Sequence, residues 1–276
     1  MKNQRMNPFS SKRNNSESKL DKINLTTSGS SSVNGRTKTA IFANSKGGVG
    51  KSTVALLMSM GLATRHGDSK IELIDLDPQA TSSDSLKRFA NRRFSVLQDD
   101  TFFLGNGFPN NSKIIGHIEQ KGSFNHNNHY LIFDSPAGSE PARSAFFLSC
   151  DIIFVPTSVS DADIFATRSF LNSLQDLFSS EAGTNAAKLP SVVILPTMVD
   201  SREDFNEVRI ELSSAAAYLG KPLYYSPLFR RAFRAEAEDK NVKDMLLHSS
   251  DYINWLTNLL IHSHAISPRP RKLFQL

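Results

Sequence analysis

Several features that this chain lacks narrow its class before any motif is considered. It has a single cysteine, Cys150, which has no partner for an internal disulfide and lies in an apolar stretch where we expect core packing. No apolar run approaches the roughly 18 residues of a transmembrane helix. No apolar segment follows the basic residues at the N-terminus, as one would in a secretory signal. We therefore expect a soluble, cytoplasmic protein.

Two further absences concern metal sites and architecture. The histidines are spaced irregularly in polar segments, which is not the spacing of a metal site, and no internal repeat is visible. The chain has 276 residues, of which 39% are hydrophobic, and this is enough for one large core.

The positive charge is concentrated near the N-terminus. The net charge is +5, which mildly favours an anionic partner. Residues 1–36 are rich in Ser, Asn and Lys and poor in large apolar residues, a composition typical of a disordered basic arm. Such an arm either keeps the protein soluble or adds electrostatic attraction to DNA, and the sequence leaves both readings open.

A glycine-rich segment is the most informative motif. Residues 46–53 read Lys-Gly-Gly-Val-Gly-Lys-Ser-Thr, a phosphate-binding loop in which Ser45 stands where the common form has glycine. Glycines let successive N–H groups point at one anion, and the positive end of the following helix adds to the attraction. Lys51 would bind the β- and γ-phosphates and Ser52 would ligate Mg²⁺. The residues expected to hold the nucleotide are Gly47, Gly48, Val49, Gly50, Lys51, Ser52 and Thr53.

Lys46 is an additional cation that has no task in this scheme. It lies too far back along the chain to serve the same phosphate as Lys51, so a second anion is needed to explain it. The alternative is an ordinary glycine turn with both lysines in solvent. The flanks favour the phosphate loop, because residues 38–43 predict a buried strand and residues 54–65 predict a helix.

Alternating strand and helix patterns predict the fold. Short apolar runs rich in β-branched residues, as in a parallel sheet covered on both faces, occur at residues 71–75, 130–134, 152–156 and 192–196. Residues 160–177 and 205–219 have a helical period, and a shorter helix is expected at 113–120. This order predicts an α/β, doubly wound, mostly parallel sheet with helices on both faces and ligands at the carboxyl ends of its strands.

The same pattern sets the expected boundaries. We expect one domain over residues 37–262 and a C-terminal tail over residues 263–276.

Acidic residues follow two of the predicted strands. Asp75 ends the strand predicted at residues 71–75 and Asp77 follows it, and the alternation of side chains along a strand puts them on the same face. Asp134 ends the strand predicted at residues 130–134. A carboxylate in this place holds Mg²⁺ through water in phosphate-loop enzymes, so we expect Ser52, Asp134 and Asp75 on the metal side of the site. The alternative is that these acids are helix caps or turn residues.

In order and spacing, the loop, Asp75-Leu-Asp-Pro-Gln and Asp134-Ser-Pro resemble the ParA/MinD family of deviant Walker-type ATPases, a group of P-loop NTPases. The chain is most like the ParA branch that segregates plasmids and chromosomes, over residues 38–245. The resemblance implies ATP and Mg²⁺ as cofactors and a homodimer that forms on ATP binding. It also implies that Lys46 reaches the partner subunit's phosphates, that Asp77 orients the attacking water, and that Asp134 lies beside Mg²⁺.

Two further segments resemble this family. Residues 195–202 are similar to its strand end near the adenine, which implies that Met198 lies beside the base, and residues 227–237 are similar to its Pro-Arg…Glu-Ala stretch. Basic residues near these places form the family's non-specific DNA-binding face. The resulting candidates are Arg202, Arg230, Arg231 and Arg234, with Lys240 and Lys243 as further ones. For each arginine, a solvated helix face is the alternative.

The resemblance implies a partition ATPase. ATP drives dimerisation, the dimer binds DNA without sequence preference at the nucleoid, and a centromere-binding ParB-like partner stimulates slow, Mg-dependent hydrolysis. One alternative is a MinD-like ATPase at a membrane surface, which needs an amphipathic terminal helix; residues 252–261 have suitable apolar spacing, although such a stripe can also pack in a core. A third is an accessory ATPase of conjugation or secretion on the same fold.

Overall fold

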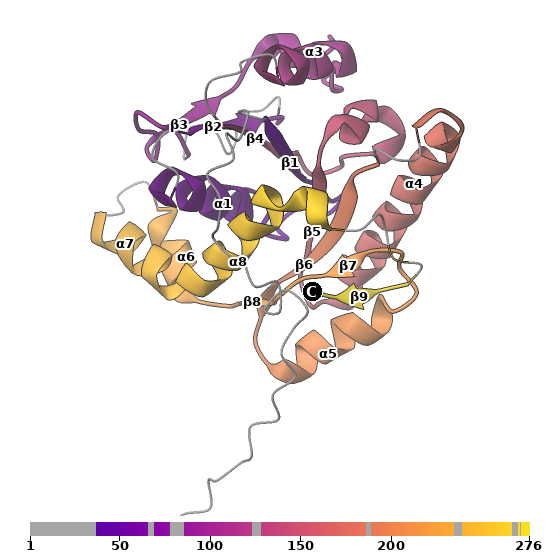
Figure 1. Cartoon of the computed structure of the whole chain (residues 1–276). Helices are drawn as coiled ribbons and strands as arrows, with labels where there is room; N and C mark the ends of the chain where they lie inside the picture. Colours follow the sequence, from indigo (N-terminus) through magenta and orange to yellow (C-terminus); the bar gives the residue numbers. More distant parts are fainter. Residues whose placement is uncertain are drawn as a thin grey trace, which may run out of the picture.

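A parallel sheet between two layers of helices forms the body of the protein (Figure 1). The computed structural model describes residues 37–65, 69–77, 86–122, 128–185, 189–234, 239–266, 270 and 272–276. Within them the strand order is β3-β2-β4-β1-β5-β6-β7-β9, with β8 also paired to β6, and every pairing is parallel. The predicted α/β, doubly wound fold is confirmed.

The elements have the following bounds. The strands are β1 (Lys38–Phe42), β2 (Lys70–Asp75), β3 (Phe94–Leu97), β4 (His129–Asp134), β5 (Ile152–Thr157), β6 (Ser191–Val199), β7 (Tyr218–Leu219), β8 (Leu223–Tyr224) and β9 (Phe274–Gln275). The helices are α1 (Lys51–Arg65), α3 (Asn111–Gly122), α4 (Asp161–Asn185), α5 (Arg202–Glu211), α6 (Pro227–Ala232), α7 (Asp239–His248) and α8 (Ser250–Ile261).

The sheet separates two hydrophobic cores. Alternation along β1 sends Ala40 and Phe42 into one core and Ile41 into the other. The first core lies under α1, α6, α7 and α8, and the second lies under α3, α4 and α5. Because both faces are covered, the central strands are apolar throughout, and the carboxyl ends of the strands are left for polar residues.

The predicted elements agree with the structure except near the end of β6. The helix expected over residues 205–219 is confirmed only as far as Glu211: α5 begins at Arg202, where Ser201 and Asp204 form a capping box, and ends at Glu211. Tyr218–Leu219 instead form β7, which pairs with β6. A short apolar run fits either period, and pairing with the sheet decides it here. The sequence patterns also missed β3, β8, β9, α6 and α7.

Two other expectations can be compared with the structure. Cys150 is buried in the second core, as predicted, and burial raises the pKa of its thiol far above the ordinary value. No helix of the described part of the chain has the length and hydrophobicity needed to cross a bilayer. The expected basic arm, residues 1–36, lies outside the described residues.

The contact between α1 and α8 gives a prediction about stability. A Cβ added at Gly61 of α1 would lie 2.3 Å from Cγ2 of Ile253 and 3.0 Å from Cγ2 of Thr257. Alanine has the higher helix propensity, but overpacking costs about 1–3 kcal/mol, so we expect Gly61→Ala to lower the free energy of unfolding by about 1–2 kcal/mol.

The matched control for this change is Gly116→Ala in α3. A Cβ at Gly116 meets no atom within 4 Å, so only propensity acts and the variant should be more stable by about 0.5–1 kcal/mol. Denaturant unfolding of both variants tests the pair. Equal changes in the free energy of unfolding of the two variants would show that the close packing at Gly61 does not affect stability.

Candidate nucleotide-binding site

The loop that follows β1 has the backbone conformation of a phosphate cradle. Gly48 and Gly50 have φ of 78° and 85°, the left-handed region that favours glycine. Gly47 does not share this conformation, because its φ is not positive. Glycine there serves a different purpose: a Cβ would lie 3.4 Å from Cβ of Ala137, in the segment that follows β4.

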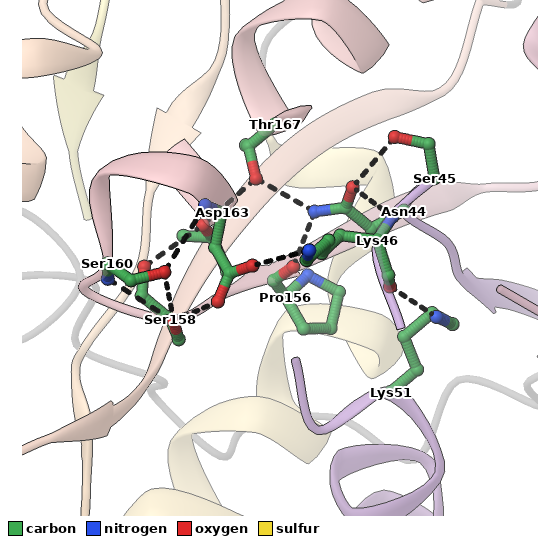
Figure 2. Close-up of polar contacts among 10 residues, drawn as sticks. Asn44, Ser45, Lys46, Lys51, Pro156, Ser158, Ser160, Asp163 and Thr167 are labelled. Carbon is green, nitrogen blue, oxygen red and sulfur yellow. Dashed lines mark hydrogen bonds and ion pairs between the residues drawn. The ribbon is translucent and has the colours of Figure 1, made fainter. Parts of the chain in front are cut away.

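Asn44 fastens the start of this loop to the neighbouring strand and helix. Its Nδ2 donates to the carbonyl oxygen of Pro156 in β5 and to Oγ1 of Thr167 in α4, both at 2.8 Å (Figure 2). Its Oδ1 accepts from the backbone N–H of Lys46 at 3.2 Å. The fully buried Asn44 side chain therefore fixes the point at which the loop leaves the sheet.

Two further hydrogen bonds hold the rest of the loop. Thr197, near the end of β6, donates from Oγ1 to the carbonyl oxygen of Val49 at 2.8 Å. The backbone N–H of Gly138 donates to the carbonyl oxygen of Ser45 at 2.8 Å. Anchored on both sides, the loop is preorganised for a ligand and does not have to be ordered by it. Sequence patterns gave no sign of Asn44 or Thr197.

The loop opens onto a polar cavity at the carboxyl edge of the sheet. The cavity contains most of the predicted phosphate and metal residues; its lining comprises Gly47, Gly48, Gly50, Lys51, Ser52, Thr53, Asp75, Asp77, Asp134, Ser135, Pro136 and Ala137. Lys51 is buried, and its Nζ donates to the carbonyl oxygen of Lys46 at 2.9 Å. Burial lowers the pKa of Lys51, and the carboxylates of Asp134 and Asp77 oppose that shift.

The three acids converge on this cavity. Asp75 and Asp134 are register partners on β2 and β4, and the backbone N–H of Asp77 donates to Oδ1 of Asp75 at 2.9 Å. Burial raises the pKa of Asp134 to about 7; a hydrogen bond from Ser52 opposes the shift and the nearby Asp75 carboxylate adds to it. Oδ1 of Asp134 is buried and accepts no hydrogen bond from the described residues.

This arrangement fits a magnesium ion. Asp134 is a buried acid with one oxygen that accepts no hydrogen bond from the described residues, and it lies beside the Asp75 carboxylate. Such a pair favours a positive charge nearby, and a hard divalent cation bound through oxygen ligands would supply it. No three His, Cys, Asp or Glu side chains of the described chain form a complete metal site by themselves. The residues therefore suit Mg²⁺ that takes part of its coordination from Ser52, water and a bound phosphate.

Lys46 has a different environment from Lys51. Its side chain is 47% exposed, and its Nζ lies 3.9 Å from Oδ1 of Asp163 in the first turn of α4. Oδ2 of Asp163 accepts a hydrogen bond from Oγ of Ser158, and its backbone N–H donates to Oγ of Ser160 at 3.3 Å (Figure 2). The spacing Ser160-x-x-Asp163 is a helix-start signal, but nothing in the sequence indicated the pairing with Lys46.

A second, more apolar pocket adjoins the loop. It is lined by Gly48, Gly50, Thr53, Val54, Thr197, Met198, Leu223, Tyr224, Tyr225, Ser226, Phe229 and Arg230. Met198 has φ of 52°, the only positive φ of a non-glycine residue in the described chain, and the pairing of β6 with β8 is irregular at this point. Backbone strain of this kind persists only where the surroundings enforce it, and it is often found at ligand sites.

The four candidate DNA-binding arginines are exposed, and they lie in two places: at the start of α5 and in or just after α6. Arg202 is the first residue of α5, whose apolar side packs in the second core. Arg230 and Arg231 belong to α6, which packs against the first core, and Arg234 follows it. Arg230 also lines the apolar pocket beside the loop.

The helix that a membrane-surface protein would need is used elsewhere. Trp255, Leu256, Leu259 and Leu260 of α8 are buried in the first core, where α8 packs against α1. The apolar stripe predicted over residues 252–261 is therefore a core stripe, which removes the feature on which the membrane alternative depended.

Comparisons with known proteins agree with this geometry. Residues 40–242 match the profile described as the CobQ/CobB/MinD/ParA nucleotide binding domain. The chain is 24% identical over 234 residues to the maintenance of carboxysome distribution protein A of Halothiobacillus neapolitanus, which covers 82% of this chain and 97% of that protein.

Solved structures show the same fold. An ATP complex of a McdA variant from Cyanothece is 14% identical with a TM-score of 0.57, and the match covers 84% of this chain and 98% of that one. The pNOB8 ParA bound to nonspecific DNA is 16% identical with a TM-score of 0.52, and the match covers 83% and 99%.

Proposed function

Because the chain belongs to the family of CobQ/CobB/MinD/ParA nucleotide-binding domains, as a ParA/MinD-type ATPase, we propose that it is a partition ATPase. In this proposal ATP and Mg²⁺ bind the phosphate cavity, the ATP-bound chain forms a homodimer, and the dimer binds DNA non-specifically. A ParB-like protein on the cargo then stimulates slow hydrolysis, which releases the dimer from DNA. Localisation at the nucleoid, in the cytoplasm, follows from the DNA step.

The separation of the two loop lysines is the observation that carries this proposal. Lys51 is buried beside the three acids, whereas Lys46 is half exposed and directed toward α4 (Figure 2). A single nucleotide in this chain's own cavity is served by Lys51 and leaves Lys46 with only its long ion pair to Asp163. A second subunit that presents its phosphates at this surface would use it.

In this proposal different residues of the cavity and of the adjoining pocket bind the phosphates, the metal ion and the base. The backbone of the loop and the Lys51 ammonium would hold the phosphates, and Ser52 with Asp134 would hold Mg²⁺. The bound ion supplies neutralisation of the charge on the β- and γ-phosphate oxygens. Met198, Tyr224 and Tyr225 form an apolar wall beside the loop that suits a purine base.

A second candidate cargo is a protein compartment in place of a plasmid or chromosome. The curated relative from Halothiobacillus is named for carboxysome distribution, and the match covers nearly its whole length. In this proposal a plasmid or chromosome and a protein compartment would be moved by the same ATP-dependent binding to DNA. The two cargoes differ only in the partner protein that stimulates hydrolysis.

Binding assays on two surfaces test the proposal. Full-length protein is mixed with random-sequence duplex DNA or with anionic liposomes, each with and without ATP and Mg²⁺. We expect ATP-dependent binding to DNA that weakens steeply with salt, and no comparable binding to liposomes. Binding to liposomes without binding to DNA would overturn the proposal in favour of a membrane-surface ATPase.

The contact between Lys46 and Asp163 gives a smaller prediction. If Lys46 has to leave Asp163 to reach a partner subunit, Asp163→Asn should favour the ATP-bound dimer, since asparagine keeps an acceptor for Ser158 but removes the charge. An ion pair at the surface contributes about 0.2–1 kcal/mol, and the homodimer would have to break two of them, so the dimer dissociation constant should fall by about 2- to 30-fold.

Sedimentation of the ATP-bound protein over a range of concentrations measures this constant. Asp161→Asn is the matched control, because Asp161 lies in the same helical turn and makes no ion pair with Lys46. A weaker dimer in Asp163→Asn than in Asp161→Asn would mean that Asp163 orients Lys46 for dimerisation and does not compete with it.

A further inference from the structure

A short basic segment before β3 is not explained by any motif that carries the family resemblance. Residues 87–93 contain four basic residues, Lys87, Arg88, Arg92 and Arg93, and no acidic residue. All four side chains are exposed, whereas Phe89 and Phe94 between and after them are buried. The segment therefore concentrates positive charge on the surface while its aromatic residues hold it to the core.

The structure places this segment beside the end of α6. Arg88 donates through its two terminal nitrogens to the carbonyl oxygens of Ala232 and Arg234. The Phe89 ring packs 6.1 Å from the ring of Phe233, centroid to centroid, and Phe89 belongs to the same core as Met245 of α7. Residues far apart in the sequence thus form one surface that continues toward Arg231 and Arg234.

Arg88 and the two following arginines have different environments. The Arg88 guanidinium lies 4.6 Å from the centroid of the Phe89 ring and donates to the carbonyl oxygens of Ala232, the last residue of α6, and of Arg234, so its role is structural. Arg92 and Arg93 make no side-chain ion pair with any acid in the described parts of the chain. Both side chains are exposed to solvent, and no acid of those parts of the chain holds either guanidinium.

The backbone that carries Arg92 and Arg93 is fixed. Oδ1 of Asn91 accepts from the backbone N–H of Arg93 at 2.9 Å and of Phe94 at 3.1 Å. The carbonyl oxygen of Arg93 accepts from Ile71 of β2 at 2.8 Å. Ligand binding would therefore order only the two side chains, and the entropic cost of ordering a loop is avoided.

We propose that Arg92 and Arg93 contact DNA phosphates and extend the DNA-binding surface of α6 to the β3 edge of the sheet. The proposal rests on the proposed function and adds residues to its DNA step. Guanidinium groups on a rigid turn suit phosphate oxygens, which carry no sequence information, in keeping with non-specific binding. A bilayer fits less well, because the neighbouring Phe89 and Phe94 are buried and offer nothing to insert.

The test measures salt dependence with the ATP-bound full-length protein. Fluorescence anisotropy with a labelled random-sequence duplex is recorded over a range of KCl concentrations for the wild type and for Arg92→Ala/Arg93→Ala. Each lost phosphate contact reduces the slope of log K against log salt by about 0.9, so we expect the double variant to lose about two units of slope for each subunit of the dimer that contacts the duplex. At ~0.1 M salt its affinity should fall by about tenfold or more, with ATP-dependent dimerisation unchanged.

Lys113→Glu and Arg93→Glu form a matched pair that separates contact from net charge. Both change the charge equally, but Lys113 is exposed on α3, which covers the opposite face of the sheet. Arg93→Glu should weaken DNA binding at least tenfold and Lys113→Glu less than twofold. Equal effects, or an unchanged slope in the double variant, would overturn this inference while leaving the proposed function intact.

Two further outcomes are informative. Failure of the wild type to bind DNA with ATP would overturn the proposed function and this inference together. Loss of binding to vesicles of anionic phospholipid in the double variant, with DNA binding retained, would assign the segment to a membrane surface and overturn the inference alone.

Discussion

A Lys46→Gln variant should bind ATP with nearly the affinity of the wild type and should fail to form the ATP-dependent dimer. Truncating one partner of an interfacial charge pair costs about 2–5 kcal/mol, and the homodimer would lose two such pairs, so the dimer dissociation constant should rise by at least about 1,000-fold. Size-exclusion chromatography with light scattering measures the dimer, and a fluorescent ATP analogue measures binding.

ATP binding should survive because the cavity does not depend on the Lys46 side chain. The hydrogen bond from Nζ of Lys51 goes to the backbone carbonyl of Lys46, which glutamine retains. Lys51→Gln is the contrasting variant: Lys51 lines the cavity, so we expect it to lose ATP affinity before any effect on the dimer is measurable. A Lys46→Gln protein that still dimerises with ATP would refute the role in trans.

The sequence predicted the parts of this molecule that follow from local pattern. The loop, the strand before it and the helix to Arg65 were predictable because glycine spacing, a buried apolar run and a helical period occur within one short segment. The convergence of Asp75, Asp77 and Asp134 was predictable because parallel strands end at one edge of the sheet, and all three do line one cavity.

Contacts between distant residues were not predictable in this way. Asn44 bonds to Thr167 and Thr197 bonds to Val49, across more than a hundred residues in each case. The charges of Lys46 and Asp163 are likewise brought together only by the pairing of β1 with β5. The segment at 87–93 has a visible charge pattern, but only its contacts with Ala232 and Phe233 place that charge beside α6.

The arginines in and after α6, which the sequence analysis treated alike as DNA-binding candidates, have different environments in the structure. Arg230 lines the pocket beside the phosphate loop, together with Met198, whereas Arg231 and Arg234 are not among the residues of that pocket. Substitution of Arg230 can therefore change nucleotide binding as well as DNA binding. Arg231 and Arg234 are the cleaner probes of the DNA surface.

We expect Asp77→Asn to retain ATP binding and the ATP-dependent dimer but to lose ATP hydrolysis. Asp77 is half-buried, lines the phosphate cavity and is set by the hydrogen bond from its backbone N–H to Asp75, so its carboxylate can orient a water molecule at the phosphate end. Asparagine is isosteric but cannot accept a proton. Because a positioned acid–base group contributes about 10²- to 10⁴-fold, phosphate release should slow by at least about 100-fold.

Asp75→Asn is the control that distinguishes the water-orienting role of Asp77 from a general effect of removing a carboxylate from the cavity. Asp75 is buried and accepts the Asp77 hydrogen bond, so its substitution should disturb the fold or metal affinity, and raising the Mg²⁺ concentration should restore part of the hydrolysis. No such rescue is expected for Asp77→Asn, whose dimers should stay bound to DNA in the presence of ATP. Full hydrolysis by Asp77→Asn, or its rescue by Mg²⁺, would transfer the water-orienting role to another residue of the cavity.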